Sequence, residues 1–220
     1  SIFVASSGRS FRTSNLESLI KEGAEAFSIR AYDDLHGSIL EIKKQRKHSI
    51  NIKINNSKVT ASELVRAFPS FSIDSKTFFY NDNAPEYRRK HIDRGLFVAS
   101  PEYAKNWFGY FRAVKQRNSA LKQGSISQAR AYDHQLVTHG ERLNGLRRSL
   151  IHDTESVFSE LIKSLLTESA RAKIFSEVSV NLFPGFDDKE GLQNELSNSN
   201  TNDLKRKSTT KGPHKADIIF

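Results

Sequence analysis

The sequence contains no cysteine, no methionine and a single tryptophan among 220 residues. Without thiols, disulfide frameworks, thiolate zinc sites, iron–sulfur ligation and cysteine nucleophiles are all excluded, which is compatible with a reducing cytoplasm. No apolar run approaches the roughly 20 residues that a membrane-spanning helix needs, and the N-terminus lacks the pattern of a signal peptide. We therefore expect a soluble protein that makes no membrane contact.

The two ends of the chain differ from those of a complete reading frame. The first residue is Ser1 instead of methionine, and the next four residues are apolar. The last four, Asp217–Phe220, read as the start of a strand. We expect the sequence to be an internal fragment of a longer protein.

The net charge of +9 is distributed unevenly along the chain. Residues 1–84 carry 12 basic and 9 acidic side chains, residues 85–150 carry 13 and 5, and residues 151–220 carry 9 and 11. Nearly the whole excess therefore lies in the middle third. Such a concentration of positive charge favours a polyanionic partner, such as nucleic acid or an anionic membrane surface.

The pattern of residues 26–74 is mainly that of β-strands. Short apolar runs alternate with polar residues at period two and follow one another in sequence, which predicts an antiparallel meander. Asn55 and Asn56 are suited to a turn because asparagine tolerates positive φ. Thr60 and Glu63 have the spacing of a capping box, which predicts a short helix after the strands.

At about Pro85 the pattern changes to a helical period, and Ser100 followed by Pro101 predicts a helix N-terminus. One stripe of that helix is expected to face the core and consists of Tyr103, Trp107, Tyr110, Phe111, Val114, Asn118 and Leu121. The opposite side carries Lys105, Arg112, Lys115 and Lys122. This basic row is either a solvated helix face or a surface for a polyanion.

A second helical pattern runs from about Ser127 to Leu166 and predicts a helical hairpin or coiled-coil-like arm. A short strand near 178–183 and a short helix near 192–196 follow it. Residues 197–210 are rich in Ser, Asn and Thr, which predicts a mobile connector.

The sequence holds no P-loop, no His-Glu-x-x-His motif and no nucleophile elbow. The seven histidines show no metal-ligand spacing, and His152 beside Asp153 reads as a surface dipeptide. One segment, Gly8–Thr13, places Arg9 and Arg12 close to a glycine, which suits either phosphate binding or an ordinary basic loop.

Four segments, in the same order, resemble the bacterial RecF family of DNA-repair ATPases, which is related to the SMC and Rad50 families. The segments are Gly8–Thr13, Pro85–Asp93, Lys115–Asn118 and Gly212–Asp217. They span nearly the whole chain. The family's Walker A loop should end just before Ser1, and its signature and Walker B motifs should follow Phe220.

The resemblance implies an α+β fold, in which an ABC-ATPase head lobe with largely antiparallel strands carries an inserted all-helical arm domain. On this basis residues 1–84 are expected to form part of the β-rich head lobe and residues 85–197 the helical domain. Residues 198–211 would be a flexible connector. Residues 212–220 would return to the head.

The function implied by the resemblance is ATP-dependent recombinational repair at single-strand gaps and stalled forks, where the protein helps to load recombinase. The implied partners are single- and double-stranded DNA, RecR, RecO and, with ATP and Mg bound, a second copy of the longer parent. The parent resembles a weak DNA-dependent ATPase in the cytoplasm, associated with the nucleoid. The present chain alone should not hydrolyse ATP, because it lacks the motifs that hold the nucleotide.

No catalytic or metal-binding residue is predicted. By resemblance, Arg9 and Arg12 lie near the nucleotide, although the same loop also faces the expected DNA surface. The expected DNA contacts are Lys105, Arg112, Lys115, Arg117, Lys122, Arg88 and Arg89, the last two of which are equally suited to structural ion pairs. A family motif of unassigned role comprises Gly212, Pro213, His214, Lys215 and Asp217.

Two departures from the family pattern concern the metal side of the nucleotide site. Ser75 and Lys76 stand where relatives carry Pro-Glu, and Phe71 lies near the place of a magnesium-contacting glutamine. Two other readings stay open. One is a helical module whose basic face binds an acidic protein, and the other is the head of a different SMC- or Rad50-like ATPase, against which the Lys115–Asn118 and Gly212–Asp217 matches argue.

Overall fold

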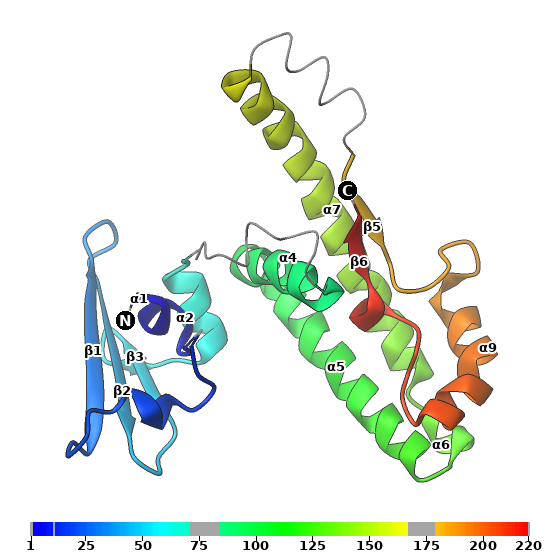
Figure 1. Cartoon of the computed structure of the whole chain (residues 1–220), viewed down its shortest axis with the longest axis horizontal. Helices are drawn as coiled ribbons and strands as arrows, with labels where there is room; N and C mark the ends of the chain where they lie inside the picture. Colours follow the sequence, from blue (N-terminus) through cyan, green and yellow to red (C-terminus); the bar gives the residue numbers. More distant parts are fainter. Residues whose placement is uncertain (1, 11, 71–83, 167–178, 220) are drawn as a thin grey trace. The chain divides into compact units, whose positions relative to one another are not determined.

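A computed structural model gives the fold of the chain (Figure 1) and describes residues 2–10, 12–70, 84–166 and 179–219. The chain divides into two compact units. Unit 1 comprises Ser1–Asp74 with Phe97–Ala99, and unit 2 comprises Ser75–Leu96 with Ser100–Phe220.

Unit 1 is built on a four-stranded antiparallel sheet whose strands follow one another in sequence order. The strands are β1 (Ala26–Asp33), β2 (Ser38–Gln45), β3 (Asn51–Ile54) and β4 (Ser57–Lys58). Period-two alternation places one set of side chains on each face of such a sheet. The predicted meander is confirmed for the described residues, while residues 71–74 of that prediction lie outside them.

The turn between β3 and β4 is formed by the two predicted asparagines. Asn55 and Asn56 have φ of 48° and 66°, a left-handed conformation that asparagine adopts more readily than other residues with a side chain. The Asn55 Oδ1 also accepts a hydrogen bond from the backbone N–H of Ile39 at 2.8 Å. The turn therefore fixes the register of β3 against β2.

The core of unit 1 lies between the inner face of the sheet and its helices. Leu40, Ile42 and Ile52 from the strands pack with Leu64, and all four side chains are buried. Figure 1 shows α1 (Ile2–Ser7) and α2 (Ala61–Ala67) on the same side of the sheet. Among the described residues of unit 1, no helix packs on the other face of the sheet.

The capping box predicted from Thr60 and Glu63 is present at the start of α2. The Glu63 backbone N–H donates to Thr60 Oγ1 at 3.3 Å, and the Thr60 N–H donates to Glu63 Oε2 at 2.6 Å. Two backbone donors at the helix N-terminus are thus satisfied.

Unit 2 is mainly helical. Its helices are α4 (Pro85–Ala99), α5 (Pro101–Lys122), α6 (Ile126–Arg130), α7 (Asp133–Leu165) and α9 (Gly191–Arg206), with the last residues of α4 assigned to unit 1. Ser100 caps α5 by accepting from the Tyr103 N–H at 3.2 Å, as predicted. The helix predicted from Ser127 is interrupted between α6 and α7, and α5 and α7 pack side by side as a helical hairpin (Figure 1).

The apolar stripe of α7 is buried only in the first part of the helix. Leu136 and Leu143 are fully buried, whereas Val157, Leu161 and Leu165 are exposed. The apolar side chains of the second part therefore do not share this burial among the described residues. In the described parts of the chain, no helix is long and apolar enough to cross a membrane.

The end of the chain differs from the predicted connector and head return. Helix α9 continues to Arg206, and Lys207 ends it with a left-handed φ of 52°, so a flexible connector over 198–211 is wrong. Strand β6 (Asp217–Ile219), which follows η2 (Pro213–Lys215), pairs antiparallel with β5 (Asn181–Phe183). Residues 212–219 accordingly pack within unit 2, because they are held by its helices and by β5.

The left-handed turn gives a direct test of the sheet geometry. Asn56→Val should lower the free energy of unfolding by about 1–2 kcal/mol, because a β-branched residue is strained at positive φ. Asn56→Gly, which relieves that strain, should leave stability unchanged or slightly higher. Urea unfolding of the two variants measures the difference, and equal stabilities would contradict the turn conformation.

Candidate nucleic-acid interface

A row of exposed cations follows one side of α5. Lys105, Arg112, Lys115 and Lys122 are all exposed and span about 25 Å of helix axis at 1.5 Å per residue. From Tyr103 to the end of the helix the sequence contains no acidic residue. The part of the helix that carries Arg112, Lys115 and Lys122 therefore contributes positive charge alone, whereas Lys105 lies within electrostatic reach of Glu102 in the first turn.

The opposite side of α5 fixes the direction of the row. Tyr103, Tyr110, Val114 and Leu121 are buried, as the apolar stripe predicted. Burial of this stripe against the rest of unit 2 holds the helix in one rotation about its axis. The backbone positions that carry the four cations are consequently fixed on the outside of the helix.

Arg117, by contrast, is fully buried and cannot contact DNA at the surface. Its Nε donates to Asp133 at 2.9 Å, and its Nη1 donates to Asp203 at 2.6 Å and to Thr209 Oγ1 at 3.0 Å. Its Nη2 donates to Asn200 Oδ1 at 3.2 Å. The sequence-based assignment of Arg117 to DNA binding is wrong, because its charge is neutralised inside the protein.

The partners of Arg117 are themselves held in place. Asp203 Oδ1 accepts from the backbone N–H and the hydroxyl of Thr210, at 2.9 and 2.5 Å. Asn118 Oδ1 accepts from the Thr209 N–H at 2.7 Å and from its hydroxyl at 2.8 Å. Burial raises the pKa of Asp133 above its ordinary value, which marks the low polarity of this site. Arg117 and Asn118, half of the Lys115–Asn118 motif, thus bind Thr209 directly, and Arg117 is linked to Thr210 through Asp203.

Arg88 and Arg89 on α4 donate hydrogen bonds to the first residue of β6 and to the residue before it. Arg88 forms a bidentate pair with Asp217 at 2.7 and 2.8 Å, and this pair lowers the pKa of that carboxyl. Arg89 donates to the carbonyl of Ala216 at 2.5 Å, and its partial burial lowers its pKa. The assignment of Arg88 to DNA is therefore wrong, and the alternative of structural ion pairs describes its geometry.

A further buried arginine, Arg147, was missed from the sequence. Arg147 of α7 donates through Nε and Nη2 to the two carboxylate oxygens of Asp93, at 2.9 and 3.0 Å. Its Nη1 donates to the carbonyl of Pro213 at 2.9 Å. Tyr103 donates to the same Asp93, and burial raises the tyrosine pKa. The available signal was the position of Arg147 four residues after Leu143, on the buried face of the helix.

The Gly212–Asp217 motif now has a structural role. His214 Nδ1 lies 2.7 Å from the Tyr110 hydroxyl, and its Nε2 lies 2.9 Å from the Thr209 carbonyl. Since a carbonyl only accepts, Nε2 carries the proton, and Nδ1 accepts from Tyr110. Gly212 has φ of 126°, and a Cβ there would lie 2.3 Å from the Tyr110 hydroxyl. Burial lowers the pKa of His214 to about 4, so the ring is neutral at pH 7.

The three motifs of unit 2 therefore meet at one segment. Arg88 and Arg89, Arg117 and Asn118, and the segment's own His214 all hold residues 209–217. The segment lacks regular structure for most of its length, so these side chains supply the fixed partners that a helix or a sheet would provide. We interpret the motifs as the framework that shapes this part of unit 2.

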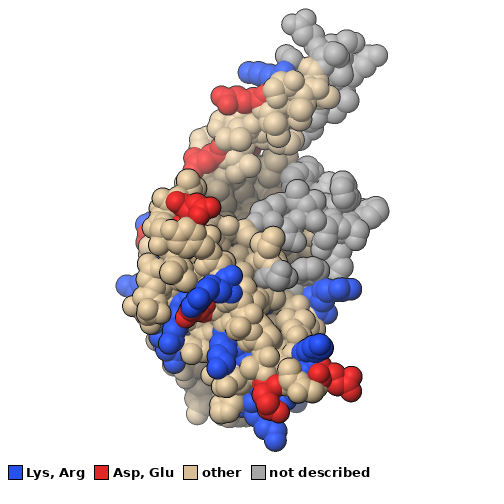
Figure 2. All heavy atoms as spheres, turned by 90° about the vertical axis from the view of Figure 1, so that its left-hand side faces the viewer, with Lys and Arg blue, Asp and Glu red and all other residues tan. Residues whose placement is uncertain are grey.

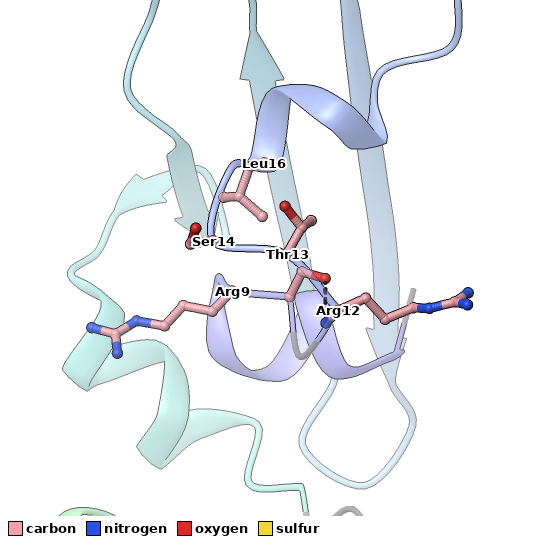
Figure 3. A pocket seen from close by; sticks show the side chains of 6 residues that line it. Arg9, Arg12, Thr13, Ser14 and Leu16 are labelled. Carbon is pink, nitrogen blue, oxygen red and sulfur yellow. Dashed lines mark hydrogen bonds between the residues drawn. The ribbon is translucent and has the colours of Figure 1, made fainter.

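The arginines of the Gly8–Thr13 segment line an open depression of about 420 Å³ in unit 1. Figure 3 shows that the Arg9 and Arg12 side chains extend to opposite sides of the loop. Gly8 has φ of 65°, which suits glycine, and the Arg12 N–H donates to Ser10 Oγ at 3.1 Å. In this arrangement the two guanidinium groups do not converge on one phosphate.

Within residues 2–10, 12–70, 84–166 and 179–219, no group of three or more His, Asp or Glu side chains is placed to hold a metal ion. His152 is exposed on α7 and lies 3.8 Å from Glu155. Phe71, Ser75 and Lys76, which carry the departures from the family pattern, lie outside the described residues.

The chain is similar to curated proteins and solved structures that carry the name RecF. No protein-family model matches the chain. RecF of Pseudoalteromonas translucida is 29% identical over the full length of this chain and 60% of its own length. RecF of Acinetobacter baumannii is 28% identical over 99% of this chain and 59% of its own.

Two solved structures of the recombination mediator RecF, described as part of the RecFOR pathway, have the same fold over 99% of this chain and 61% of theirs. The structure with ATPrS has a TM-score of 0.85, the structure with ATP a TM-score of 0.80, and both are 24% identical in sequence. The resemblance to RecF and the α+β fold are confirmed. The chain spans about 60% of the length of the relatives that it matches.

The buried network predicts a large stability difference between two arginines of the same helix. Arg117→Ala should lower the free energy of unfolding by about 3–5 kcal/mol, because Asp133 and Asp203 lose their counter-charge inside the protein. Arg112→Ala, on the exposed side, should change it by less than about 0.5 kcal/mol. Urea denaturation compares the two, and similar effects would contradict the burial of Arg117.

His214 predicts a pH dependence of stability. Its folded pKa of about 4 lies below the ordinary value of 6.5, so the unfolded chain binds more protons between these values. Stability contributed by the neutral ring is therefore lost as pH falls, by about 2 kcal/mol between pH 7 and pH 5. The His214→Gln variant should lose that much less over the same interval in urea unfolding. An equal loss in both proteins would exclude a buried neutral ring.

Proposed function

We propose that this chain is the DNA-binding part of a RecF-like, ATP-dependent recombinational repair protein that acts at single-strand gaps and stalled forks and helps to load recombinase. The observation that carries the proposal is the exposed basic row of α5, in a chain whose whole length is similar to part of RecF. DNA phosphates are the partner whose charge matches such a row.

The chemistry of the row fits sequence-independent binding. Lys105, Lys115 and Lys122 are point charges, and Arg112 adds a planar group that pairs bidentately with a phosphate. Contacts of this kind position the protein on DNA without reading its sequence. A repair protein that acts wherever gaps occur needs this property.

The other arginines have different parts in the proposal. Arg117 and Arg88 support the surface from within, because they hold residues 209–217. Arg89 acts in the same way through Ala216. Arg9 and Arg12 stay close to the nucleotide in the longer parent, in keeping with the open depression that they line.

The nucleotide belongs to the parent protein in this proposal. The solved relatives contain ATP or ATPrS, and ATP with Mg would bring two copies of the parent together around DNA. The residues of this chain do not fit a triphosphate site by themselves, since the sequence has no P-loop and the Arg9 and Arg12 side chains diverge. We therefore derive no hydrolysis step for it.

The cellular setting follows from the same relatives. RecO and RecR are the proposed protein partners, because the solved RecF structures are described within the RecFOR pathway. The proposed location is the bacterial cytoplasm, close to the nucleoid. The alternative is a helical module whose basic row binds an acidic protein, and the α5 cations favour it as much as DNA on charge alone.

The α5 row is tested by removing three of its charges. The triple variant Arg112→Ala, Lys115→Ala and Lys122→Ala should weaken duplex binding at low salt by about tenfold or more, since three phosphate contacts are lost. The slope of log affinity against log salt should fall by about 2.7. Fluorescence anisotropy with a labelled duplex over a salt series measures both quantities.

A charge-matched control separates the row from net charge. Lys189→Ala, Lys205→Ala and Arg206→Ala remove three exposed charges elsewhere in unit 2 and should change the affinity far less. If both variants lowered the DNA affinity equally, net charge alone would explain binding and the α5 row would have no specific role. An absence of duplex binding at low salt would leave the acidic-protein alternative and end the DNA proposal.

A further inference from the structure

The outer face of the sheet in unit 1 is a second basic surface. Phe27, Ile29 and Ala31 of β1 point to the core, so the intervening Ser28, Arg30 and Tyr32 point away from it. On β2 the same alternation buries Leu40 and Ile42 and turns Glu41 and Lys43 outward. This outer face is opposite the side of the sheet that packs against the helices.

The strand register brings the cations of this face together. Arg30 is paired with Glu41, Glu41 with Lys53, and Lys53 with Lys58, so four charged residues form one row across the sheet. Lys43 lies two residues from Glu41, on the same face. Figure 2 looks onto this side of the molecule and shows Lys and Arg side chains gathered there around a smaller acidic group.

One end of the face carries apolar groups instead of charges. Tyr32 is 64% exposed and lies directly opposite Ile39 in the neighbouring strand. It stands two residues from Arg30 along β1, on the same outward face. An exposed aromatic ring beside a basic row offers a stacking surface next to phosphate-binding groups.

We propose that this outer face binds a single-stranded segment of nucleic acid, with Lys43, Lys53 and Lys58 on the phosphates and an unpaired base stacked on Tyr32. The proposal rests on the proposed function, since it assumes that the chain acts on DNA. A single strand is favoured over a duplex because a duplex hides its base faces inside the stack. Base stacking on an open sheet is indifferent to sequence.

Glu41 tunes the charge of the face. Arg30 donates to it, which lowers the pKa of its carboxyl, and Lys53 adds to the same effect. The carboxylate is thus ionised at neutral pH and opposes phosphate binding. Removal of the Glu41 charge should therefore raise the affinity for single-stranded nucleic acid. A misfolded variant would lower that affinity, so the two effects can be told apart.

The experiment measures the affinity of the full chain for a labelled oligothymidylate and for a duplex of equal length. The triple variant Lys43→Ala, Lys53→Ala and Lys58→Ala should weaken single-strand binding by about tenfold and duplex binding by much less. Tyr32→Ala should weaken single-strand binding by about fivefold or more, and Tyr32→Phe by less than about twofold. Glu41→Gln should strengthen it by about twofold.

The outcomes separate the two proposals. If the sheet variants leave single-strand affinity unchanged while the α5 triple variant weakens duplex binding, this inference fails and the proposed function stands. Equal weakening of both DNA forms by the sheet triple variant would also overturn the single-strand assignment. If wild type binds neither DNA form at low salt, both proposals fail together.

Discussion

The salt bridge between Arg117 and its two aspartates is the interaction on which the rest of unit 2 depends. Burying a guanidinium away from solvent costs much free energy unless carboxylates and other hydrogen-bond acceptors surround it. Asp133 and Asp203 supply the negative charge, and Asn200 and Thr209 accept the further hydrogen bonds of the guanidinium. Because these groups come from α7, α9 and the loop after it, meeting the demands of one side chain fixes the relative positions of three segments.

Helix α5 thereby divides its basic residues between two tasks. Lys115 and Arg117 are two positions apart and point to different environments, one to solvent and the other to the protein interior. The buried arginine fixes the helix against α7 and α9, so the backbone that carries the exposed lysine is held in place. A charged residue on a fixed helix loses less backbone freedom when it meets a phosphate than one on a mobile loop.

Local patterns allowed much of the fold to be predicted, and long-range pairing set the limit. The meander, the Asn55 and Asn56 turn and the Ser100 cap depend on neighbours in sequence, so their residue types were sufficient. The burial of Arg117 was also visible in principle, because it lies seven residues after Tyr110 and four before Leu121, on the apolar face. Its pairing with Asp203, 86 positions away, has no local signature. The prediction of a mobile connector was wrong for the same reason. Polar residues such as Ser199 and Asn200 are typical of solvent-exposed segments, and nothing local shows that Asn200 accepts from Arg117 or that Ser199 donates to Asp203.

The separation of 86 positions between Arg117 and Asp203 has a consequence for synthesis on the ribosome. Arg117 and the helical hairpin of α5 and α7 emerge first. The Asp203 carboxylate of α9 and the Thr209 hydroxyl lie 86 and 92 residues after Arg117 and emerge later. Until then the guanidinium has only part of its counter-charge, and the hairpin cannot bury it without loss. Unit 2 therefore completes its interior only after α9 has been made, which makes this unit dependent on contacts distant in sequence and correspondingly slow to fold.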